Sequence, residues 1–422
     1  MKKTRLSSKI MGLLGLAALV LTAGAPAQAA FVVGGENGWQ MTYDGMINVF
    51  AVYRTQDNLQ DSHGNVAAPN LNSQGFTVRT GLLPSIFAFN VKSPTINGVD
   101  YAARIGLYPQ IQNYGQRTGF GTHYNGGTTI DIREVFFTAD GKFGQVLAGR
   151  ALNLYQGKNI LSDMTLFGVG VPLDMGSGGG TTLGHIGYGY AFPSFNSQFR
   201  YTTPDMSGFK VAFSICEPSR ISGSSSNGGA MFDATKLNQP RFETEISYAK
   251  AYTGGKMSAW LSGMYQEAKS IGLVSMNRKV DSLGGAGGVS ASFGPFEATI
   301  SGYGGRGIGT LFIQDDDVDG NALDGIGNER TSYGGLAQAM YTIGKVKLGA
   351  QYGMNYADRT DYETANGYNA HVKSRQAVTG GVYYSVNKYL QLVGEYSWDR
   401  TSYYNNLRQT GNTFSLGTIF VW

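Results

Sequence analysis

The stretch Lys345-Val-Lys-Leu-Gly-Ala-Gln-Tyr-Gly-Met-Asn-Tyr-Ala357 alternates apolar and polar residues along most of its length. Large apolar residues recur every second position, while Lys347, Gln351 and Asn355 lie between them. A period of two places successive side chains on opposite faces of a β-strand. The pattern recurs up to the end of the chain, and one apolar and one polar face on every strand is typical of a membrane barrel with a wet interior.

Sixteen segments of this kind can be counted, which predicts an all-β fold: a transmembrane antiparallel barrel of sixteen strands. Seven connections are short turns and eight are longer loops rich in Gly, Asn, Asp or Ser, and the two kinds alternate. An even number of strands with both ends on the short-turn side is the outer-membrane arrangement, in which the long loops are extracellular. The predicted strands are 39–54, 74–92, 99–113, 128–138, 144–151, 196–203, 208–216, 241–251, 256–269, 279–293, 296–306, 330–343, 345–359, 372–386, 389–402 and 412–422.

Residues 1–29 have the three parts of a secretory signal peptide. A basic segment between Lys2 and Lys9 precedes an apolar core from Met11 to Leu21, and Ala27-Gln-Ala29 matches the cleavage pattern. The apolar core is about half the ~20 residues that a membrane-spanning helix needs, so an uncleaved anchor is the weaker interpretation. Residues 30–422 are predicted to form a single domain, because no linker or change of period divides them.

The charge balance fits an exported barrel. The chain has 33 basic and 29 acidic residues, and the predicted signal contains four of the basic ones and none of the acidic ones, so the mature chain is formally neutral. This balance gives no reason to expect a nucleic acid partner. Charged residues are only 15% of the chain, below the ~25% of ordinary soluble domains, and a surface that partly faces lipid explains the deficit.

The longest loop, residues 152–195, differs from the other loops in composition. It begins with a mixed apolar stretch and continues into Gly-rich segments. Phe167, Val169 and Val171 would be costly to expose in a surface loop, and loops of this length within a compact domain are usually functional or disordered. We therefore expect the loop to pack against the interior of the barrel wall.

These features resemble the general porins of Gram-negative outer membranes over essentially the whole mature chain. The resemblance is most specific in Gly149-Arg150, Asp163-Met164 and Phe167-Gly168, which look like a family pattern in which the third loop folds inward and narrows the pore. It implies a homotrimeric, non-enzymatic channel of the outer membrane, in contact with its lipid, that passes small hydrophilic solutes and ions by passive diffusion. The second loop, 114–127, would then reach into a neighbouring subunit.

The family sets wall arginines against carboxylates of the third loop. By resemblance, the arginines here are Arg79, Arg133, Arg150 and Arg200, and the carboxylates in the loop are Asp163 and Asp174. Arg104 is added from strand alternation alone, since it falls on a lumen position. Alternation also implies that Glu134 points outward if Arg133 points inward.

This set of charges predicts the selectivity of the pore. Rows of charged side chains determine which ions a narrow pore favours, and five arginines against two carboxylates favour a mild preference for anions. Leu166 stands where the family usually has an acidic residue, which argues against strong cation selectivity. The alternative is a substrate-specific channel, for a sugar or an aromatic or other organic acid, with a path lined by Tyr155, Phe167, Tyr188, Tyr190 and Phe192.

The acidic segment 315–320 leaves two interpretations open. Asp315, Asp317 and Asp319 reproduce the first half of a calcium-binding loop, but the twelfth position is Ile326 and no helices flank the segment. It is therefore either a solvated acidic loop or a calcium site, and no other cofactor is expected. The four histidines fall in predicted loops rather than on wall strands, which argues against a hydrolase with a Ser–His pair on its barrel.

Overall fold

The computed structural model describes residues 31–68, 73–112, 130–172, 180–223, 233–270, 278–314 and 322–422. The predicted signal peptide, the second loop at 114–127, Asp174 and the acidic segment 315–320 lie outside these residues. No helix in the described part of the chain is long and apolar enough to cross a membrane.

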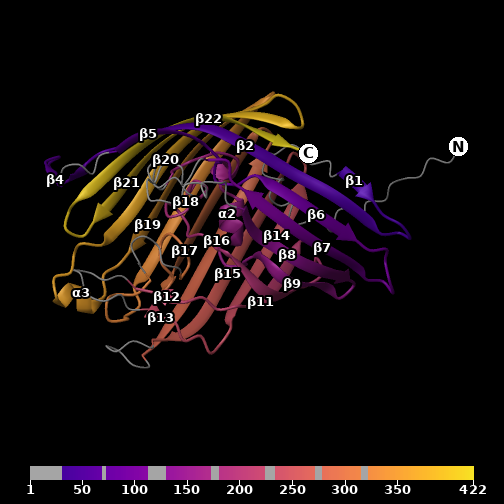
Figure 1. Cartoon of the computed structure of the whole chain (residues 1–422), viewed down its shortest axis with the longest axis horizontal. Helices are drawn as coiled ribbons and strands as arrows, with labels where there is room; N and C mark the ends of the chain where they lie inside the picture. The colour runs from indigo at the N-terminus through magenta and orange to yellow at the C-terminus, as the bar shows by residue number, and fades with distance from the viewer. Residues whose placement is uncertain are drawn as a thin grey trace, which may run out of the picture.

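The wall is a closed antiparallel barrel of sixteen strands, counted over the described residues, as the sequence predicted (Figure 1). Neighbours in sequence pair with each other, and β2 pairs with β22 from Met46 opposite Val421 to Gln56 opposite Gly411, which closes the ring. The wall strands are β2 (Gln40–Gln56), β5 (Ser73–Arg79) continued by β6 (Ile86–Lys92), β7 (Asp100–Pro109), β8 (Ile130–Gly141), β9 (Gly144–Leu152), β10 (Phe195–Thr202), β11 (Phe209–Cys216), β14 (Arg241–Tyr252), β15 (Gly255–Lys269), β16 (Lys279–Phe293), β17 (Phe296–Arg306), β18 (Thr331–Ile343), β19 (Val346–Ala357), β20 (Val372–Ser385), β21 (Leu390–Tyr403) and β22 (Arg408–Val421).

The remaining elements are short and lie outside the sixteen wall strands. β1 pairs with the first residues of β2 beside the chain's C-terminal end (Figure 1). These elements are β1 (Phe31–Gly34), β3 (Leu59–Gln60), β4 (Val66–Ala68), β12 (Ile221–Ser222), β13 (Asp233–Ala234), the helices α2 (Gly157–Leu161) and α3 (Asp361–Ala365), and the 3-10 helix η2 (Met164–Phe167).

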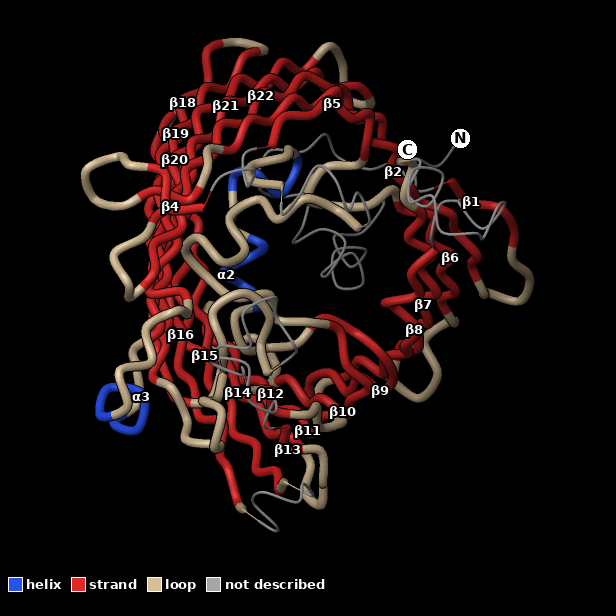
Figure 2. Tube along the Cα trace, turned by 60° about the vertical axis from the view of Figure 1, so that its left-hand side comes forward, coloured by secondary structure: helices blue, strands red, loops and turns tan. Residues whose placement is uncertain are grey.

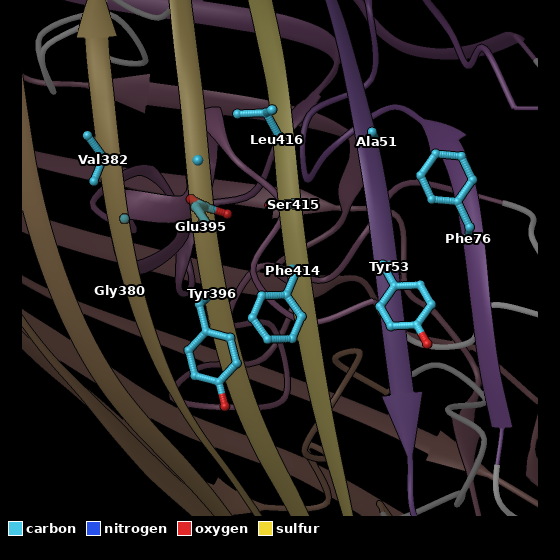
Figure 3. Close-up of a pocket in the computed structure, with 12 residues that line it drawn as sticks. Ala51, Tyr53, Phe76, Gly380, Val382, Glu395, Tyr396, Phe414, Ser415 and Leu416 are labelled. Carbon is cyan, nitrogen blue, oxygen red and sulfur yellow. The ribbon is translucent and has the colours of Figure 1, made fainter.

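The alternation read from the sequence is realised as an apolar outer face and a polar inner face. On β19, Leu348 and Tyr352 are 42% and 43% exposed on the outside, whereas Gln351 and Asn355 are 3% and 1% exposed inside. Figure 3 shows the same outer surface on neighbouring strands, where Tyr53, Phe414 and Tyr396 lie side by side across β2, β22 and β21. The groove beside them, lined in part by glycines of β20 and β21, therefore lies on the outer face of the barrel and outside the pore.

The second predicted strand, 74–92, is interrupted in the structure. Between β5 and β6 the chain leaves the ladder at Thr80–Ser85 and binds the third loop instead: the Leu82 N–H donates to the Gly168 carbonyl at 2.9 Å, and the Gly81 carbonyl accepts from the Thr182 N–H at 3.0 Å. A Cβ at position 81 would lie 2.0 Å from the Gly168 oxygen, so glycine allows this approach. Pro84 has no N–H to give to a ladder, which fits the break.

The eighth long connection is also shorter than the sequence suggested. Strand β22 begins at Arg408 rather than at residue 412, so only residues 404–407 link β21 to β22. Asn406 adopts a left-handed conformation (φ 65°), and the Tyr403 N–H donates to the Leu407 carbonyl at 2.9 Å. Asn tolerates this conformation, so the chain turns tightly where the sequence suggested a loop.

The outward position of Leu416 gives a test of the membrane-facing surface. Leu416 is 69% exposed on β22, and an arginine on the lipid face of a barrel costs about 2–4 kcal/mol near the bilayer midplane. We expect Leu416→Arg to lower the free energy of unfolding from lipid vesicles by an amount of this order, measured by denaturant titration. The control Leu416→Ala removes the same side chain without adding charge, and equal stability of the two variants would contradict the assignment.

Candidate channel constriction

The third loop, residues 153–194, is here called loop 3. Its described parts, 153–172 and 180–194, fold into the barrel as the sequence predicted (Figure 2). Its apolar residues are buried in a cluster shared with the inner wall: Val169 and Val171 are fully buried, and Phe167 is 9% exposed. The wall contributes residues such as Phe50, Met340 and Val393 to the same cluster. The loop is therefore held by apolar burial, which the sequence indicated from the cost of exposing these side chains.

Buried polar side chains of the wall supply partners for the backbone of loop 3. The Glu243 carboxylate on β14 accepts the N–H groups of Leu154 and Tyr155, at 2.7 and 3.0 Å. On the far side of the barrel, Glu395 on β21 accepts from Val169 and Gly170 at 2.7 and 2.9 Å. Amide side chains act similarly: Gln338 on β18 accepts from Met164, and Asn355 on β19 accepts from Gly189. Buried backbone N–H groups need partners, and outside a strand ladder the wall provides them.

Asp163 is buried inside loop 3 and organises it, which corrects the prediction that it faces the wall arginines. It is 1% exposed and caps η2, because one carboxylate oxygen accepts from the N–H and hydroxyl of Thr165 at 2.8 and 2.7 Å. The same oxygen accepts from Gln351 of β19 at 2.9 Å, and the other accepts from the Tyr190 hydroxyl at 2.6 Å and the His185 N–H at 3.2 Å. None of its partners in the described structure is an arginine.

The residues around Asp163 stay uncharged near neutral pH. Burial, followed by the nearby carboxylate, raises the pKa of Tyr190 well above its usual range, so its hydroxyl remains a donor. Burial lowers the pKa of His185, whose ring nitrogens contact the Tyr188 carbonyl at 3.1 Å and the Thr379 hydroxyl at 2.8 Å. The neutral ring can donate to the first and accept from the second, which ties the loop to β20.

Two of the predicted arginines hold loop 3 in place. Arg79, at the end of β5, donates to the Gly180 carbonyl at 2.9 Å. Arg200 on β10 donates to Gln198 at 2.8 Å and to the carbonyl of Leu152, where the loop begins. Both side chains point inward as predicted. Arg79 contacts loop 3 through a carbonyl oxygen, and Arg200 contacts the carbonyl of the last residue of β9, just before the loop, rather than Asp163.

Arg104 is part of a charged network on the opposite part of the wall, on β2, β6, β7 and β8. Its guanidinium donates to Glu134 at 2.7 Å, to Asp44 at 3.1 Å and to Asn90 at 2.9 Å. The Tyr108 hydroxyl also donates to Glu134. Asp44 and Glu134 were missed from the sequence, although Asp44 shares the lumen face of its strand with Asn48, four residues on, and alternation could have found it.

A β-bulge lets Arg133 and Glu134 both face the lumen, so the expectation that Glu134 points outward is wrong. Between Gly106 and Tyr108 on β7, the partner strand β8 advances three residues, from Glu134 to Asp131. The extra residue shifts the alternation. Glu134 is 8% exposed, and the Arg133 guanidinium lies 5.1 Å from the ring centroid of Tyr108 and 5.3 Å from that of Phe195.

Arg150 lies on the outer face of β9, which corrects its placement on the pore wall. Leu147 and Ala151 are fully buried on the inner side of the strand. Because side chains alternate between the two faces, Arg150 lies on the outer side, where it is exposed. Its neighbours across the sheet are Val135, which is 43% exposed, and Ser197. The Gly-Arg pattern located the loop correctly but did not determine the face of the strand.

The predicted aromatic path is mostly buried within loop 3. Tyr155 and Tyr190 are fully buried, and Tyr188 and Phe167 are 6% and 9% exposed. Phe192 alone of this set is partly exposed among the described residues. These rings form the core between loop and wall, because a long loop inside a barrel needs its own apolar interior.

Residues 307–314 of the sixth loop, which is here called loop 6, also fold inward, which the sequence did not predict. The Phe192 N–H donates to the Leu311 carbonyl at 2.8 Å, and Asn355 donates to the Thr310 carbonyl at 2.7 Å. Ile308, Leu311 and Ile313 are buried. Their apolar spacing was a signal for this contact, in the same way as for loop 3.

A closed barrel with a loop packed inside it defines the class: a multi-pass β-barrel channel of the outer membrane. A family model described as Gram-negative porin matches residues 15–403, and the chain therefore belongs to the Gram-negative porin family. Among curated protein sequences, no relative matches the chain.

Three solved structures illustrate the likeness in fold. The outer membrane channel DcaP of Acinetobacter baumannii is 15% identical with a TM-score of 0.62, over 94% of this chain and 100% of that one. The anion-selective porin from Comamonas acidovorans is 13% identical with a TM-score of 0.53, over 91% and 100%. The trimer form of OmpT from Vibrio cholerae is 12% identical with a TM-score of 0.51, over 92% and 100%.

An experiment can distinguish the structural role of Asp163 in loop 3 from an electrostatic role in ion selectivity. In Asp163→Asn, an amide group replaces the oxygen that accepts from Tyr190 and His185, so these donors lose their acceptor, at a cost of about 1–3 kcal/mol. We expect hydrogen exchange of residues 153–172 and 180–194 to speed up correspondingly.

The matched variant Glu134→Gln removes a carboxylate from the lumen network instead. It should shift the reversal potential toward anions more than Asp163→Asn does, when both are measured in planar bilayers. A larger shift in Asp163→Asn would contradict the buried, structural role of Asp163.

Proposed function

We propose that this porin forms a water-filled channel for passive diffusion of small hydrophilic solutes and ions, narrowed by loop 3. The observation that carries the proposal is the fixed position of loop 3, whose anchors lie on β14, β15, β18, β19, β20 and β21. The charged network of Asp44, Arg104 and Glu134 lies on the other part of the wall. A solute passing between them meets the loop on one side and fixed charges on the other.

The selectivity that we propose is weak. The expected mild anion preference rested on five arginines against two carboxylates, but Arg150 faces outward and Arg104 is paired with Asp44 and Glu134. Arg133 likewise has Asp131 at 2.8 Å. Arg200 has the carboxylates of Glu243 and Glu245 nearby, so most of the inward arginines are offset by carboxylates. Charges of opposite sign cancel at a distance, so the net field left in the lumen is small.

Single-channel recording tests this proposal. In planar bilayers with a tenfold potassium chloride gradient, we expect a reversal potential far below the ~59 mV of an ideally selective pore, because the lumen charges are balanced. Conductance should increase linearly with salt concentration. A reversal potential near the ideal value would contradict the proposed selectivity, and the absence of any conductance from correctly folded protein would contradict the channel itself.

A second candidate, a channel that favours organic acids, is supported by different residues from those first expected. Tyr155, Tyr188 and Tyr190 are buried and do not line a path. The contact of the Arg133 guanidinium with the rings of Tyr108 and Phe195 is the observation that favours an organic anion. A preference for sugars has no comparable support in the described residues.

We propose that the protein has no enzymatic activity. Family and fold point to a channel, and His63, His185 and His371, the described histidines, lie outside the wall strands. A nucleophile–base pair on the wall would need a base there, and histidine is the residue most often used.

We propose a homotrimer that is embedded in outer-membrane lipid through its apolar outer face. OmpT of Vibrio cholerae, which shares the fold, has a trimer form. Oligomers of closed β-barrels bury large apolar surfaces and resist detergent, so unheated samples should migrate as a trimer in detergent gels and heated ones as a monomer. Chemical crosslinking in membranes provides the control for dissociation by detergent. Monomers alone in both experiments would contradict the trimer.

A further inference from the structure

The guanidinium of Arg133 contacts two aromatic rings and one carboxylate. Its guanidinium carbon lies 5.1 Å from the ring centroid of Tyr108 and 5.3 Å from that of Phe195. Its Nε donates to Asp131 at 2.8 Å. The two cation–π contacts and the hydrogen bond at Nε together restrict the orientation of the group.

The outer edge of this guanidinium remains available. The Nη groups of Arg133 donate to no residue in the described structure, and the side chain is 15% exposed. Arg104, by contrast, donates to Asp44, Glu134 and Asn90. A fixed, planar pair of Nη donors matches the two oxygens of a carboxylate.

A row of phenylalanine rings continues from this arginine across the inside of the barrel. Phe195 lies 6.4 Å from Phe192 of loop 3, and Phe192 meets Phe312 of loop 6 edge-to-face at 5.9 Å, measured between ring centroids. All three rings are partly rather than fully buried. They form an apolar surface beside the Arg133 guanidinium, whereas the tyrosines of loop 3 are enclosed in its core.

We propose that Arg133, Phe195 and Phe192 form a binding subsite for small aromatic carboxylates on their way through the channel. The carboxylate receives two parallel N–H donors from the Nη groups, and the ring of the solute lies against the phenylalanines. Asp131 cancels most of the charge of Arg133, so the subsite suits a monoanion better than a phosphate dianion. Binding of this kind is weak, as conduction requires, because a solute must also leave.

This subsite rests on the proposed channel function, and blocking of the channel by solutes tests it. The full-length protein in planar bilayers is exposed to benzoate, acetate or cyclohexanecarboxylate while chloride conductance is recorded. We expect benzoate to reduce the conductance saturably, and acetate to do so with at least about a tenfold higher half-blocking concentration, because it lacks the ring.

The variants separate the contribution of the Arg133 guanidinium to block from that of the phenylalanine rings. Arg133→Gln should raise the half-blocking concentration of benzoate by at least about tenfold. Arg133→Lys keeps the positive charge but lacks the planar pair of Nη donors, and should raise that concentration by several-fold. Phe195→Leu should weaken block by benzoate and leave block by acetate unchanged. The matched control is Arg359→Gln, which removes another arginine stacked on an aromatic ring, 4.8 Å from Tyr404, on the loop between β19 and β20.

The outcomes distinguish this inference from the channel proposal. Conductance in potassium chloride alone reports whether each variant folds and forms a pore. Equal block of the wild type and Arg133→Gln by benzoate would overturn the subsite while leaving the channel intact. Equal block by benzoate, cyclohexanecarboxylate and acetate would overturn the role of the rings, and a greater effect of Arg359→Gln than of Arg133→Gln would overturn the assignment to Arg133.

Discussion

The structure depends on the need of every backbone N–H and C=O group shielded from water to find a hydrogen-bond partner. In the wall, the closed ladder from β2 round to β22 meets this need without a free edge. Loop 3 lies inside that wall and has no ladder of its own. Some of its N–H groups donate to carbonyls within the loop. Others are satisfied by Glu243, Glu395 and side-chain amides that the inner face of the wall presents.

This use of polar residues divides the inner wall into two parts. Carboxylates that accept buried N–H groups are enclosed by the loop and cannot act strongly on a passing solute. Asp163 belongs with them, since all its described partners are within loop 3 or on β19. The charged network that we propose acts on a solute lies on β2, β7 and β8, where Arg104 pairs with Asp44 and Glu134. Loop 3 thus takes its side-chain hydrogen bonds from other strands than this network, while β2 contributes apolar residues such as Phe50 to the cluster that buries the loop.

Much of the fold follows from local pattern, and much of the site does not. The alternation of apolar and polar residues along β19 predicted both that the segment is a strand and which side chains face inward, because successive side chains of a strand lie on opposite faces. Apolar residues such as Val169 and Val171 also predicted that loop 3 packs inside. The partners of Asp163 could not be predicted, since they come from residues such as Gln351, far away in sequence. The prediction that Arg150 faces the pore was wrong for another reason: a motif identifies a sequence position but not the face of the strand on which its side chain lies.

The bulge in β8 shows how one extra residue changes what a pore can recognise. With unbroken alternation, only one of Arg133 and Glu134 could face the lumen. The bulge brings both inside, so that Glu134 pairs with Arg104 while Arg133 contacts the rings of Tyr108 and Phe195. Net charge acts over about a Debye length and determines ion preference, whereas two donors aimed at a carboxylate act only in contact. A pore with balanced charges can therefore be nearly indifferent to small ions and still distinguish one organic anion from another.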